Sequence, residues 1–537
     1  MYRRLGLHGR PLSLAVSATC TIGFLLFGYD QGVMSGLITH PDFVATFPAL
    51  KDNSTMQGLV TALYEIGCLF GAIFVLFFGD IIGRKKGILA GATIMILGTV
   101  VQITSFKAGG LAQFIAGRII TGVGNGMNTS SIPTYQAECA NTKNRGLLIC
   151  IQGGIIAFGT LISYWLNFGV NEYPGSFAWR FPIAFQIVFG LMILAGMSVL
   201  PDSPRWLLSC GRDKEGTEVI AALYGLPVDA HETLLHKRII LESIAASSDT
   251  GADGKAHVTP FSELVTNGRT QHFRRMLLGA SSQLMQQIGG CNAVIYYFPI
   301  LFESSIKQSR HSSLVMGGVN MAVYATFATA SWFIIERVGR RKLFIYGTIG
   351  QMLGMIITFA GLIPGTPNAA KGAAAGLFVY IAAFGASWLP LPWLYPAEVN
   401  PLRTRAKANA VSTCTNWAFN FLVVLVTPIM VDRIGWGTYL FFACVNACFL
   451  PIIYFWYPET RKRSLEEIDI IFAKGYCENI SYVRAARELP LLSAEEVEEM
   501  ALRYGAGLDE GRRRMGYTYR EESGGSGEVV GEVEKTV

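Results

Sequence analysis

The sequence predicts an all-α membrane protein in which twelve transmembrane helices form two related six-helix bundles. The first observation is composition: 51% of the residues are hydrophobic and only 15% are charged, whereas soluble proteins carry roughly 25% charged residues. The second is the presence of many apolar runs long enough to cross a bilayer as a helix, which takes roughly 20 residues. The third is an internal repeat, because motifs of the first half recur in the same order in the second half.

The apolar runs form two groups of six, separated by a polar loop. We predict spans at residues 12–38, 54–79, 87–105, 110–136, 146–168 and 181–200, and at 274–302, 313–335, 343–363, 372–395, 407–431 and 436–457. The chain is thus organised as an N-terminal segment (1–11), a first bundle (12–200), a central loop (201–273), a second bundle (274–457) and a C-terminal tail (458–537). The tail ends in EESGGSGEVVGEVEKTV, which is too polar to bury a core, so the tail is predicted to be partly disordered.

Loop charges and cysteines limit the orientation and the function classes. Loops on the side of the N-terminus hold more Lys and Arg residues than the opposite loops, which predicts that both termini and the central loop are cytoplasmic. No continuous basic arm is present, so no nucleic-acid partner is expected. The ten cysteines are scattered without CxxC spacing, so no metal site is predicted. For the sequon at Asn53, glycosylation on the outside and a chance match are both open interpretations.

Three motif pairs define the internal repeat. GDIIGRKKG after the second span recurs as ERVGRRKL after the eighth, with Gly83 and Gly339 256 positions apart. Glu138 recurs as Glu398 after 260 positions, and PDSPRWL recurs as PETRKRSL after 257 positions. A parallel repeat of this kind places a solute site between the two halves, near the midplane of the bilayer.

Polar side chains of the seventh span are candidates for binding a hydroxylated solute. A hydroxyl group that leaves water costs a few kcal/mol unless it finds a partner. The segment QQIGGCNAVIYYFP supplies Gln286, Gln287, Asn292 and Tyr297, and its two glycines permit a bend. The alternative is that these amides only join helices to one another.

The tenth and eleventh spans add further candidates. WLPLPWLYPAE places Trp393 beside two prolines, where its ring can stack on the apolar face of a sugar. Asn416 and Asn420 lie one turn apart in the eleventh span. Each residue also has a structural interpretation, which is packing for the tryptophan and helix-to-helix hydrogen bonds for the asparagines.

Three ionisable residues lie inside predicted spans, where charges are costly and mark functional positions. They are Asp30, Glu65 and Arg118. A carboxylate beside a guanidinium can alternate between a protonated state and an ion pair. Asp30 can therefore couple proton entry to solute entry, with Arg118 adjusting its proton affinity. The alternative is a permanent ion pair between Asp30 and Arg118.

Several motifs together resemble the sugar porters of the major facilitator superfamily, over about residues 19–468. They are GRKKG and GRRKL, PTYQAE followed by Arg145, PDSPRWL, QQIGGCN followed by two tyrosines, PWLYPAE with Arg405, and PETRKRSLEEID. The resemblance implies the major facilitator fold, sugar contacts at Gln286, Gln287, Asn292, Trp393 and Asn416, and a proton-coupling aspartate with its arginine partner at Asp30 and Arg118. It also implies a cytoplasmic charge network of conformational gating residues at Asp80, Arg84, Glu138, Arg145, Arg205, Arg337, Arg341, Glu398 and Arg405.

One position departs from the family pattern. Most sugar porters carry a sugar-binding glutamine where this chain has Gly153, and Gln152 is about 100° away around the helix. The surrounding segment looks like the fungal branch that includes yeast glycerol/proton symporters as well as hexose and pentose porters. The missing amide leaves a smaller polyol open beside a monosaccharide.

The resulting hypothesis is a monomeric, proton-coupled symporter of a monosaccharide or polyol in a fungal plasma membrane, working by alternating access. It is not expected to be an enzyme or to hold a cofactor, because no nucleophile, base and third group occur together. A passive sugar facilitator, a non-transporting sugar sensor and a porter for a metabolite other than a nutrient sugar are the alternatives.

Overall fold

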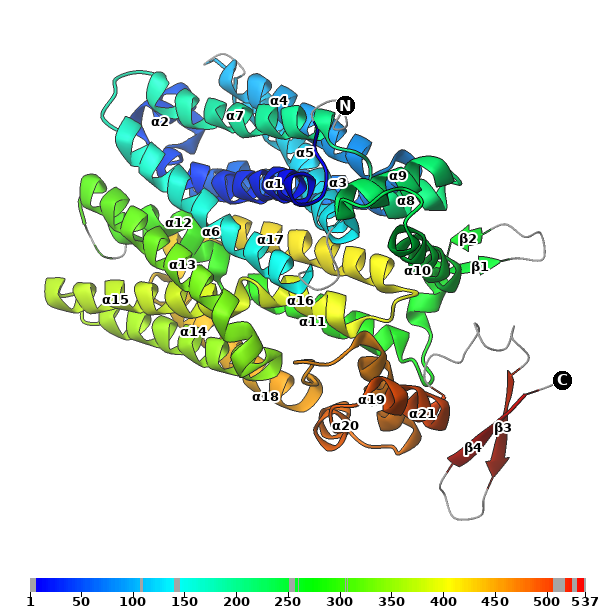
Figure 1. Ribbon diagram of the computed structural model, residues 1–537. Helices are drawn as coiled ribbons and strands as arrows, with labels where there is room; N and C mark the ends of the chain where they lie inside the picture. Colours follow the sequence, from blue (N-terminus) through cyan, green and yellow to red (C-terminus); the bar gives the residue numbers. More distant parts are fainter. Residues whose placement is uncertain are drawn as a thin grey trace.

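The apolar runs fold into two bundles of helices, seen one above the other in Figure 1. A computed structural model describes residues 6–106, 110–139, 145–250, 256–258, 260–304, 306, 308–505, 517–523 and 529–535, with the backbone alone for 145–150, 243, 245–250, 256–258, 304, 367, 494–495, 517–523 and 529–535. The first bundle consists of α1 (Arg10–Leu37), α3 (Ser54–Ile82), α4 (Arg84–Ile103), α5 (Gly110–Cys139), α6 (Arg145–Val170) and α7 (Phe177–Val199). The second consists of α11 (His272–Ile288) with α12 (Cys291–Ser304), α13 (Arg310–Val338), α14 (Arg340–Leu362), α15 (Pro367–Ala383) with a π-helical turn (Phe384–Trp388) and α16 (Leu391–Val399), α17 (Arg405–Ile434) and α18 (Gly437–Trp456).

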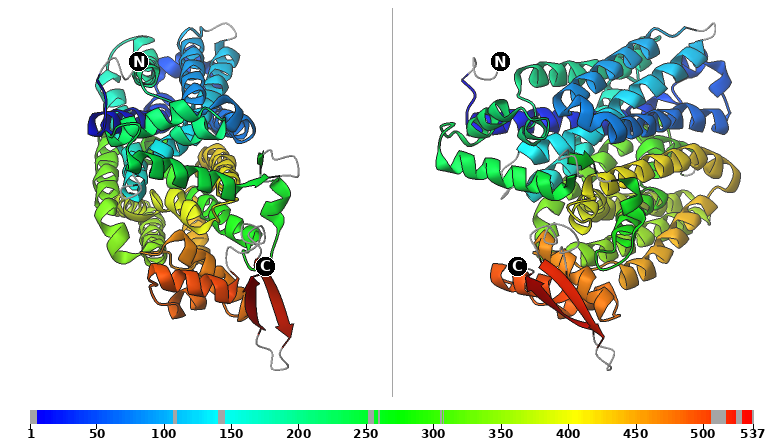
Figure 2. Two further views of the ribbon diagram at one scale, coloured as in Figure 1. Left: turned by 45° about the vertical axis from the view of Figure 1, so that its right-hand side comes forward. Right: turned by 90° about the vertical axis from the view of Figure 1, so that its right-hand side faces the viewer.

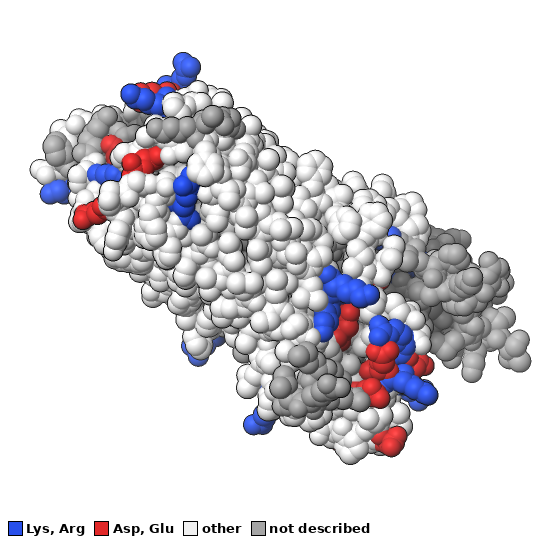
Figure 3. All heavy atoms as spheres, turned by 90° about the horizontal axis from the view of Figure 1, so that it is seen from above, with Lys and Arg blue, Asp and Glu red and all other residues white. Residues whose placement is uncertain are grey.

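These elements coincide with the predicted spans. Within the described part of the chain, ten helices are long and apolar enough to cross a membrane. The other two predicted spans are α5, which is rich in glycine and polar residues, and the seventh span, which is divided into α11 and α12. Figure 3 shows a broad uncharged surface between two charged ends on the face it displays. Large apolar side chains such as Phe77, Leu191 and Phe333 are more than half exposed, as expected for contact with lipid.

Two glycines at matching positions of the repeat turn the chain between consecutive spans. Gly83, between α3 and α4, has a φ of 89°, and Gly339, between α13 and α14, has a φ of 94°. Such positive φ values favour glycine because it has no Cβ. A side chain at Gly83 would also collide with the ring of Trp206, and one at Gly339 with the carboxylate of Glu459. The two turns are therefore structural equivalents.

The bundles contact each other through helices that are related by the same repeat. The second span α3 packs against the eleventh span α17, and the fifth span α6 packs against the eighth span α13. Figure 2 shows the two bundles side by side along their whole length. An interior site between the halves is therefore framed by α1, α3 and α6 on one side and by α11 to α13, α16 and α17 on the other.

The connecting segments gather at the two ends of the bundles. One end, which we term the loop end, carries α8 (Pro204–Ser209), α9 (Asp213–Tyr224), α10 (His231–Ser247), a 3₁₀ turn (Phe261–Val265), α19 (Leu465–Cys477), α20 (Tyr482–Glu488) and α21 (Ala494–Tyr504). The other end, termed the α2 end, carries α2 (Pro41–Thr46) and a 3₁₀ turn (Pro48–Leu50). Two short antiparallel hairpins pair β1 (Ser248–Thr250) with β2 (Ala256–Val258) and β3 (Tyr517–Ser523) with β4 (Val529–Lys535).

The C-terminal tail contains more folded structure than its polar end indicates. Helices α19 to α21 enclose a small apolar cluster of their own, which includes Ile470, Ile471, Leu489 and Tyr504. Ser464 begins α19 with a capping box, in which its hydroxyl and the Glu467 carboxylate bond each other's backbone N–H groups. The amphipathic segment LEEIDIIFAK is the sequence signal for this helix.

Candidate functional site

A break in the seventh span lies at the centre of the molecule. Helix α11 ends at Ile288 and α12 begins at Cys291. Gly290 has a φ of 96°, and a side chain there would also collide with the ring of Phe442. The carbonyl oxygen of Gly289, freed by the break, accepts hydrogen bonds from Tyr380 Oη at 2.9 Å and Asn446 Nδ2 at 3.0 Å. A broken helix inside a membrane is tolerated where neighbours satisfy its backbone in this way.

The predicted amides form one hydrogen-bonded network around this break. Asn416 Nδ2 donates to Gln283 Oε1 at 2.5 Å and to Gln286 Oε1 at 3.0 Å, while Gln286 Nε2 donates to the carbonyl of Trp388 at 2.7 Å. Asn292 Nδ2 donates to Gln287 Oε1 and to Asn420 Oδ1. Asn292 Oδ1 is buried without a partner among the described residues. The network therefore joins helices and still holds an unused acceptor.

A small cavity adjoins the network. It is lined by Phe27, Gln31, Ile156, Gln286, Gln287, Cys291, Asn292, Ile295, Tyr324, Phe384, Leu389, Trp393 and Asn416. About 20 Å³ of it is open to the centre of a water-sized sphere, which is room for little more than one water molecule. A larger solute enters only if the surrounding helices separate, so the structure represents a closed state of the cavity.

Asp30 and Arg118 form a buried ion pair next to the cavity. Arg118 Nη1 lies 3.3 Å from Asp30 Oδ1, and neither side chain has any exposed surface. The guanidinium also lies 4.5 Å above the ring of Tyr64, and its Nη2 lies 3.4 Å from the carbonyl oxygen of Thr61. Gln31, the residue after Asp30, lines the cavity. The ionisable pair is thus one residue away from the amide-lined space.

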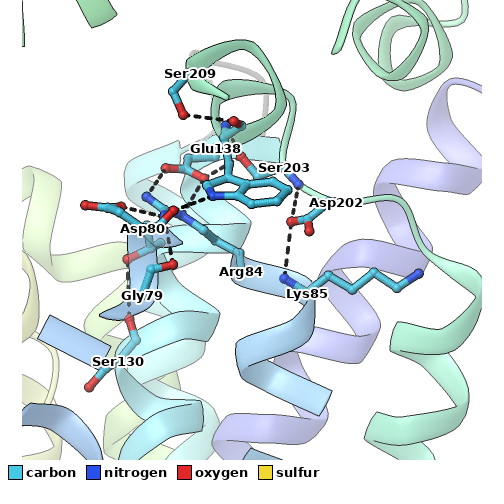
Figure 4. Close-up of polar contacts among 11 residues, drawn as sticks. Gly79, Asp80, Arg84, Lys85, Ser130, Glu138, Asp202, Ser203 and Ser209 are labelled. Carbon is cyan, nitrogen blue, oxygen red and sulfur yellow. Dashed lines mark hydrogen bonds and ion pairs between the residues drawn. The ribbon is translucent and has the colours of Figure 1, made fainter. Parts of the chain in front are cut away.

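A charge cluster at the loop end fixes the turn between α3 and α4 (Figure 4). Arg84 Nη1 lies 2.6 Å from Asp80 Oδ1, and the guanidinium contacts both carboxylate oxygens of Glu138, at 3.1 and 3.2 Å. The hydroxyl of Ser203 also donates to Glu138, and the backbone N–H of Lys85 donates to Asp202. The cluster ties α3, α4 and α5 to the segment that follows α7.

The second bundle holds a matching cluster. Arg340 Nη2 lies 2.7 Å from both Glu336 Oε1 and Glu398 Oε1, and Thr460 Oγ1 donates to Glu398 Oε2 at 2.6 Å. The backbone N–H of Arg340 donates to Glu459 at 2.8 Å. Among the described residues, each arginine bonds only groups of its own half, so neither arginine bridges the two bundles in this structure.

At the α2 end, one arginine does bridge the halves. Arg310, at the start of α13, donates to Gly36 O at 2.8 Å, to Thr39 Oγ1 at 2.8 Å and to Asn171 Oδ1 at 3.0 Å. Its partner within the second half is Glu303, at 3.7 Å. Arg310 thus contacts three sites on the first bundle and helps to hold this end closed, together with the hydrogen bond that Ser54 Oγ of α3 donates to Asp432 Oδ2 of α17 at 3.2 Å.

Comparisons with known proteins decide the family. The family model described as "Sugar (and other) transporter" matches residues 16–472. The chain is 45% identical over 533 residues to the sugar transporter STL1 of Saccharomyces cerevisiae, covering 97% of this chain and 92% of that protein. It is 30% identical to the high-affinity hexose transporter HXT6 of the same yeast, covering 91% and 88%. This chain belongs to the sugar transporter family. It is therefore a multi-pass membrane transporter and not an enzyme.

A solved structure confirms the predicted fold. The transporter matches the proton:xylose symporter XylE bound to 6-bromo-6-deoxy-D-glucose with a TM-score of 0.72 and 23% sequence identity, covering 87% of this chain and 100% of that chain. The twelve-helix major facilitator arrangement predicted from the sequence is thus the arrangement of this transporter.

The structural equivalent of Arg84 in the second half is a residue that was not among the predicted gating residues. Arg337 is exposed, and Arg341 donates from Nη2 to the carbonyl of Tyr454 at 2.8 Å. Arg340 instead occupies the position equivalent to Arg84, with Glu336 in place of Asp80. The offset between Gly83 and Gly339 leads directly to this pair, so the sequence held the signal.

Other predicted gating residues have separate locations. Arg405 donates from Nε and Nη2 to the carbonyl of Asn400, at 3.1 and 3.0 Å. Arg205 lies half-buried in the first turn of α8. The side chain of Arg145 lies outside the described residues. Asn53 is exposed at the α2 end, where its Oδ1 caps α3 by accepting the Met56 N–H at 3.0 Å.

The predicted solute residues divide into two groups. Gln286, Gln287, Asn292, Trp393 and Asn416 line the cavity. Asn420 lies behind them and contacts the cavity only through Asn292. Tyr297 points elsewhere, and its hydroxyl donates to the carbonyl of Val424 at 2.8 Å. Gln31 is a lining amide that the sequence reasoning missed, although its position beside Asp30 was a usable signal.

Proposed function

We propose that this transporter is a proton-coupled symporter for a monosaccharide or polyol, which works by alternating access. The observation that carries the proposal is the buried Asp30–Arg118 pair, one residue from the amide-lined cavity. An ion pair excluded from water is a proton-sensitive element, because a proton on the carboxylate removes the attraction between its members.

Protonation of Asp30 leaves Arg118 in place and removes the ion pair that links it to the first helix. The guanidinium keeps its contacts with Thr61 and Tyr64 on α3, whereas the link from α5 to α1 is lost. Because α1 carries both Asp30 and Gln31, a change at the ion pair reaches the cavity wall directly. Solute loading and proton loading thus favour the same rearrangement of α1.

The cavity chemistry favours a small polyhydroxylated solute. Amides can donate and accept, which matches the alternating demands of neighbouring hydroxyl groups, and Trp393 offers an apolar face. On the α6 side, a Cβ at Gly153 would lie 3.4 Å from Pro390 Cα, and Gln152 bonds Gln136 instead of facing the cavity. With no α6 amide available, a glycerol-sized polyol or a monosaccharide held by the second bundle fits best.

We place the transporter as a monomer in a fungal plasma membrane with the loop end and both termini in the cytoplasm. The excess of basic residues in the loops of that end supports this orientation. Asn53 then faces outside, where it is available for glycosylation. The proton is the coupling ion, and no resident cofactor takes part.

Uptake assays in a transporter-deficient yeast test the proposal. Labelled glycerol, pentoses, hexoses and disaccharides are supplied at acidic external pH, with and without an uncoupler. We expect the wild type to accumulate one of them above its external concentration, and the uncoupler to abolish the accumulation. Asp30→Asn is expected to equilibrate the same solute without accumulating it.

Glu172→Gln, an exposed carboxyl-to-amide change at the α2 end, is the matched control and should accumulate solute like the wild type. Uptake that ignores the uncoupler, or accumulation by Asp30→Asn, would identify a passive facilitator instead. A chain that reaches the membrane and moves no solute at all would be a sensor.

A histidine at the α2 end predicts a second pH effect. His40 accepts the Asp42 N–H at Nδ1 and contacts the Asn171 carbonyl through Nε2, each at 3.2 Å, which fixes the neutral tautomer. Burial lowers the pKa of His40, and Arg310 acts in the same direction, against the hydrogen bond to Asn171. The closed end therefore has its full stability above the ordinary histidine pKa of about 6.5 and loses it as pH falls through the lowered value.

External acid should consequently favour opening at the α2 end. Labelling of Cys291 in the cavity by an impermeant thiol reagent, followed by mass spectrometry, reports this opening. Acid changes the reactivity of the thiol equally in both proteins, so a difference between them reports opening. We expect the ratio of the labelling rate at acidic pH to that at neutral pH to be a few-fold higher in the wild type than in His40→Gln. His311→Gln, an exposed histidine at the same end, should behave like the wild type, and an unchanged pH response in His40→Gln would contradict the prediction.

A further inference from the structure

A second buried carboxyl connects the two bundles. Glu65 of α3 and Tyr296 of α12 are both fully buried, and Tyr296 Oη donates to Glu65 Oε1 at 2.5 Å. Helix α3 belongs to the first half and α12 to the second, so this hydrogen bond crosses the interface that must open and close. The other carboxyl oxygen, Oε2, has no hydrogen-bond partner among the described residues.

We propose that Glu65 is a second proton-binding site of the transporter, which shares the single positive charge of Arg118 with Asp30 and is covered by Tyr296 in the closed state. The proposal rests on the proposed proton-coupled function and adds a residue, a proton position and a moving cover to it. Neither the family comparison nor the motif analysis assigns such a role to Glu65.

The first argument is the balance between burial and hydrogen bonding. An ionised carboxylate in the dry interior of a membrane protein loses its hydration, and a single hydrogen bond recovers only part of that loss. Glu65 has one such bond and one empty oxygen. The closed structure therefore suits a neutral Glu65 with its proton on Oε2.

The second argument is the charge count around Glu65. Arg118 bonds Thr61 O, one turn from Glu65 on the same face of α3, and ion-pairs with Asp30. Two carboxyls thus compete for one guanidinium. The titratable or charged groups that interact with Glu65 are Asp30 from α1, Tyr64 and Cys68 from α3, Arg118 from α5, and Cys291, Tyr296 and Tyr297 from α12.

This arrangement permits an exchange that leaves the net charge unchanged. When Asp30 is ionised, it takes the charge of Arg118 and Glu65 keeps its proton. When Asp30 gains a proton, Arg118 becomes available to compensate an ionised Glu65. One proton can therefore move from the Glu65 carboxyl to the Asp30 carboxylate without leaving an uncompensated charge inside the protein. Release of the Glu65 proton to water is compensated in the same way only after Asp30 has taken up another proton.

The third argument is the position of Tyr296. It lies on the half-helix that follows the break at Gly290, and the preceding residue, Ile295, lines the cavity. Movement of α12 away from α3 removes the Tyr296 hydroxyl and admits water to Glu65. Hydration favours the ionised form, so opening of α12 and release of the proton are coupled events.

Infrared spectroscopy of the purified full chain tests the proposal independently of transport. A protonated carboxyl has a carbonyl band that a carboxylate lacks. We expect this band in the wild type near neutral pH and its loss in Glu65→Gln. In Asp30→Asn the band should weaken, because Arg118 is then free to compensate an ionised Glu65. In Tyr296→Phe, which keeps the ring and removes the hydroxyl, the band should move to higher frequency, because its carbonyl oxygen loses the hydrogen bond.

A wild-type spectrum without the band, or a band that survives in Glu65→Gln, would overturn the proposal. If Glu65→Gln does not fold, the frequency shift in Tyr296→Phe remains decisive, and an unshifted band there also overturns it. A carrier that proves to be a passive facilitator fails the accumulation assay but leaves these spectra interpretable. If coupling holds, Glu65→Gln should retain solute exchange and lose accumulation.

Discussion

Replacing Arg340 with alanine is expected to reduce uptake to less than a tenth of the wild-type rate. Arg340 is 5% exposed and contacts Glu336 as well as both oxygens of Glu398. Without it, Glu398 keeps only the hydroxyl of Thr460 in a largely buried environment. Removing one member of a buried ion pair costs about 3–5 kcal/mol, because the other charge is left without compensation.

Arg337→Ala is the matched control, since Arg337 lies three residues earlier, at the end of α13, with an exposed side chain. It should transport at close to the wild-type rate. Arg340→Lys should fall between the two, because lysine keeps the charge but cannot form the forked contact with a carboxylate. Initial uptake rates, normalised to the amount of protein at the membrane, give the comparison. Normal uptake by Arg340→Ala would show that the cluster has no part in the transport cycle.

The sequence predicts the elements of this protein better than the faces that they present. Apolar length locates the spans, since the hydrocarbon thickness imposes that length on every crossing helix. It does not show which side faces the cavity, because lipid-facing and interior positions are both apolar in a membrane protein. For this reason the sequence did not predict that Phe27, Ile156 and Tyr324 line the cavity.

Adjacent residues of one type illustrate the same limit at the site. Tyr296 and Tyr297 differ by about 100° around α12, and only the structure shows that Tyr296 faces Glu65 while Tyr297 bonds the carbonyl of Val424. The repeat was more informative than the motif. It pairs Arg84 with Arg340, whereas the resemblance to the sugar porters implied Arg337 and Arg341. The amides were predictable because polar side chains inside a membrane are costly and therefore mark functional positions.

The second large effect is expected at the contact between α3 and α5, which holds the ionisable residues in place. Gly67 and Gly71 of α3 face backbone carbonyls of α5, and Gly122 and Gly126 of α5 face those of α3. A Cβ at Gly126 would lie 2.1 Å from the Cys68 carbonyl oxygen. Because backbone cannot move aside like a side chain, the two helices must separate to accept it.

We therefore expect Gly126→Val to abolish recovery of folded transporter, and Gly126→Ala to reduce it strongly. Overpacking of an interior costs about 1–3 kcal/mol where flexible side chains can yield, and here the obstacle is a carbonyl group. Gly372→Ala in α15, where a Cβ would have no neighbour within 4 Å, should be harmless. The yield of monodisperse protein after detergent extraction measures the difference. Equal yields for Gly126→Ala and Gly372→Ala would mean that α3 and α5 tolerate separation, and that Glu65 and Arg118 do not depend on this contact for their positions.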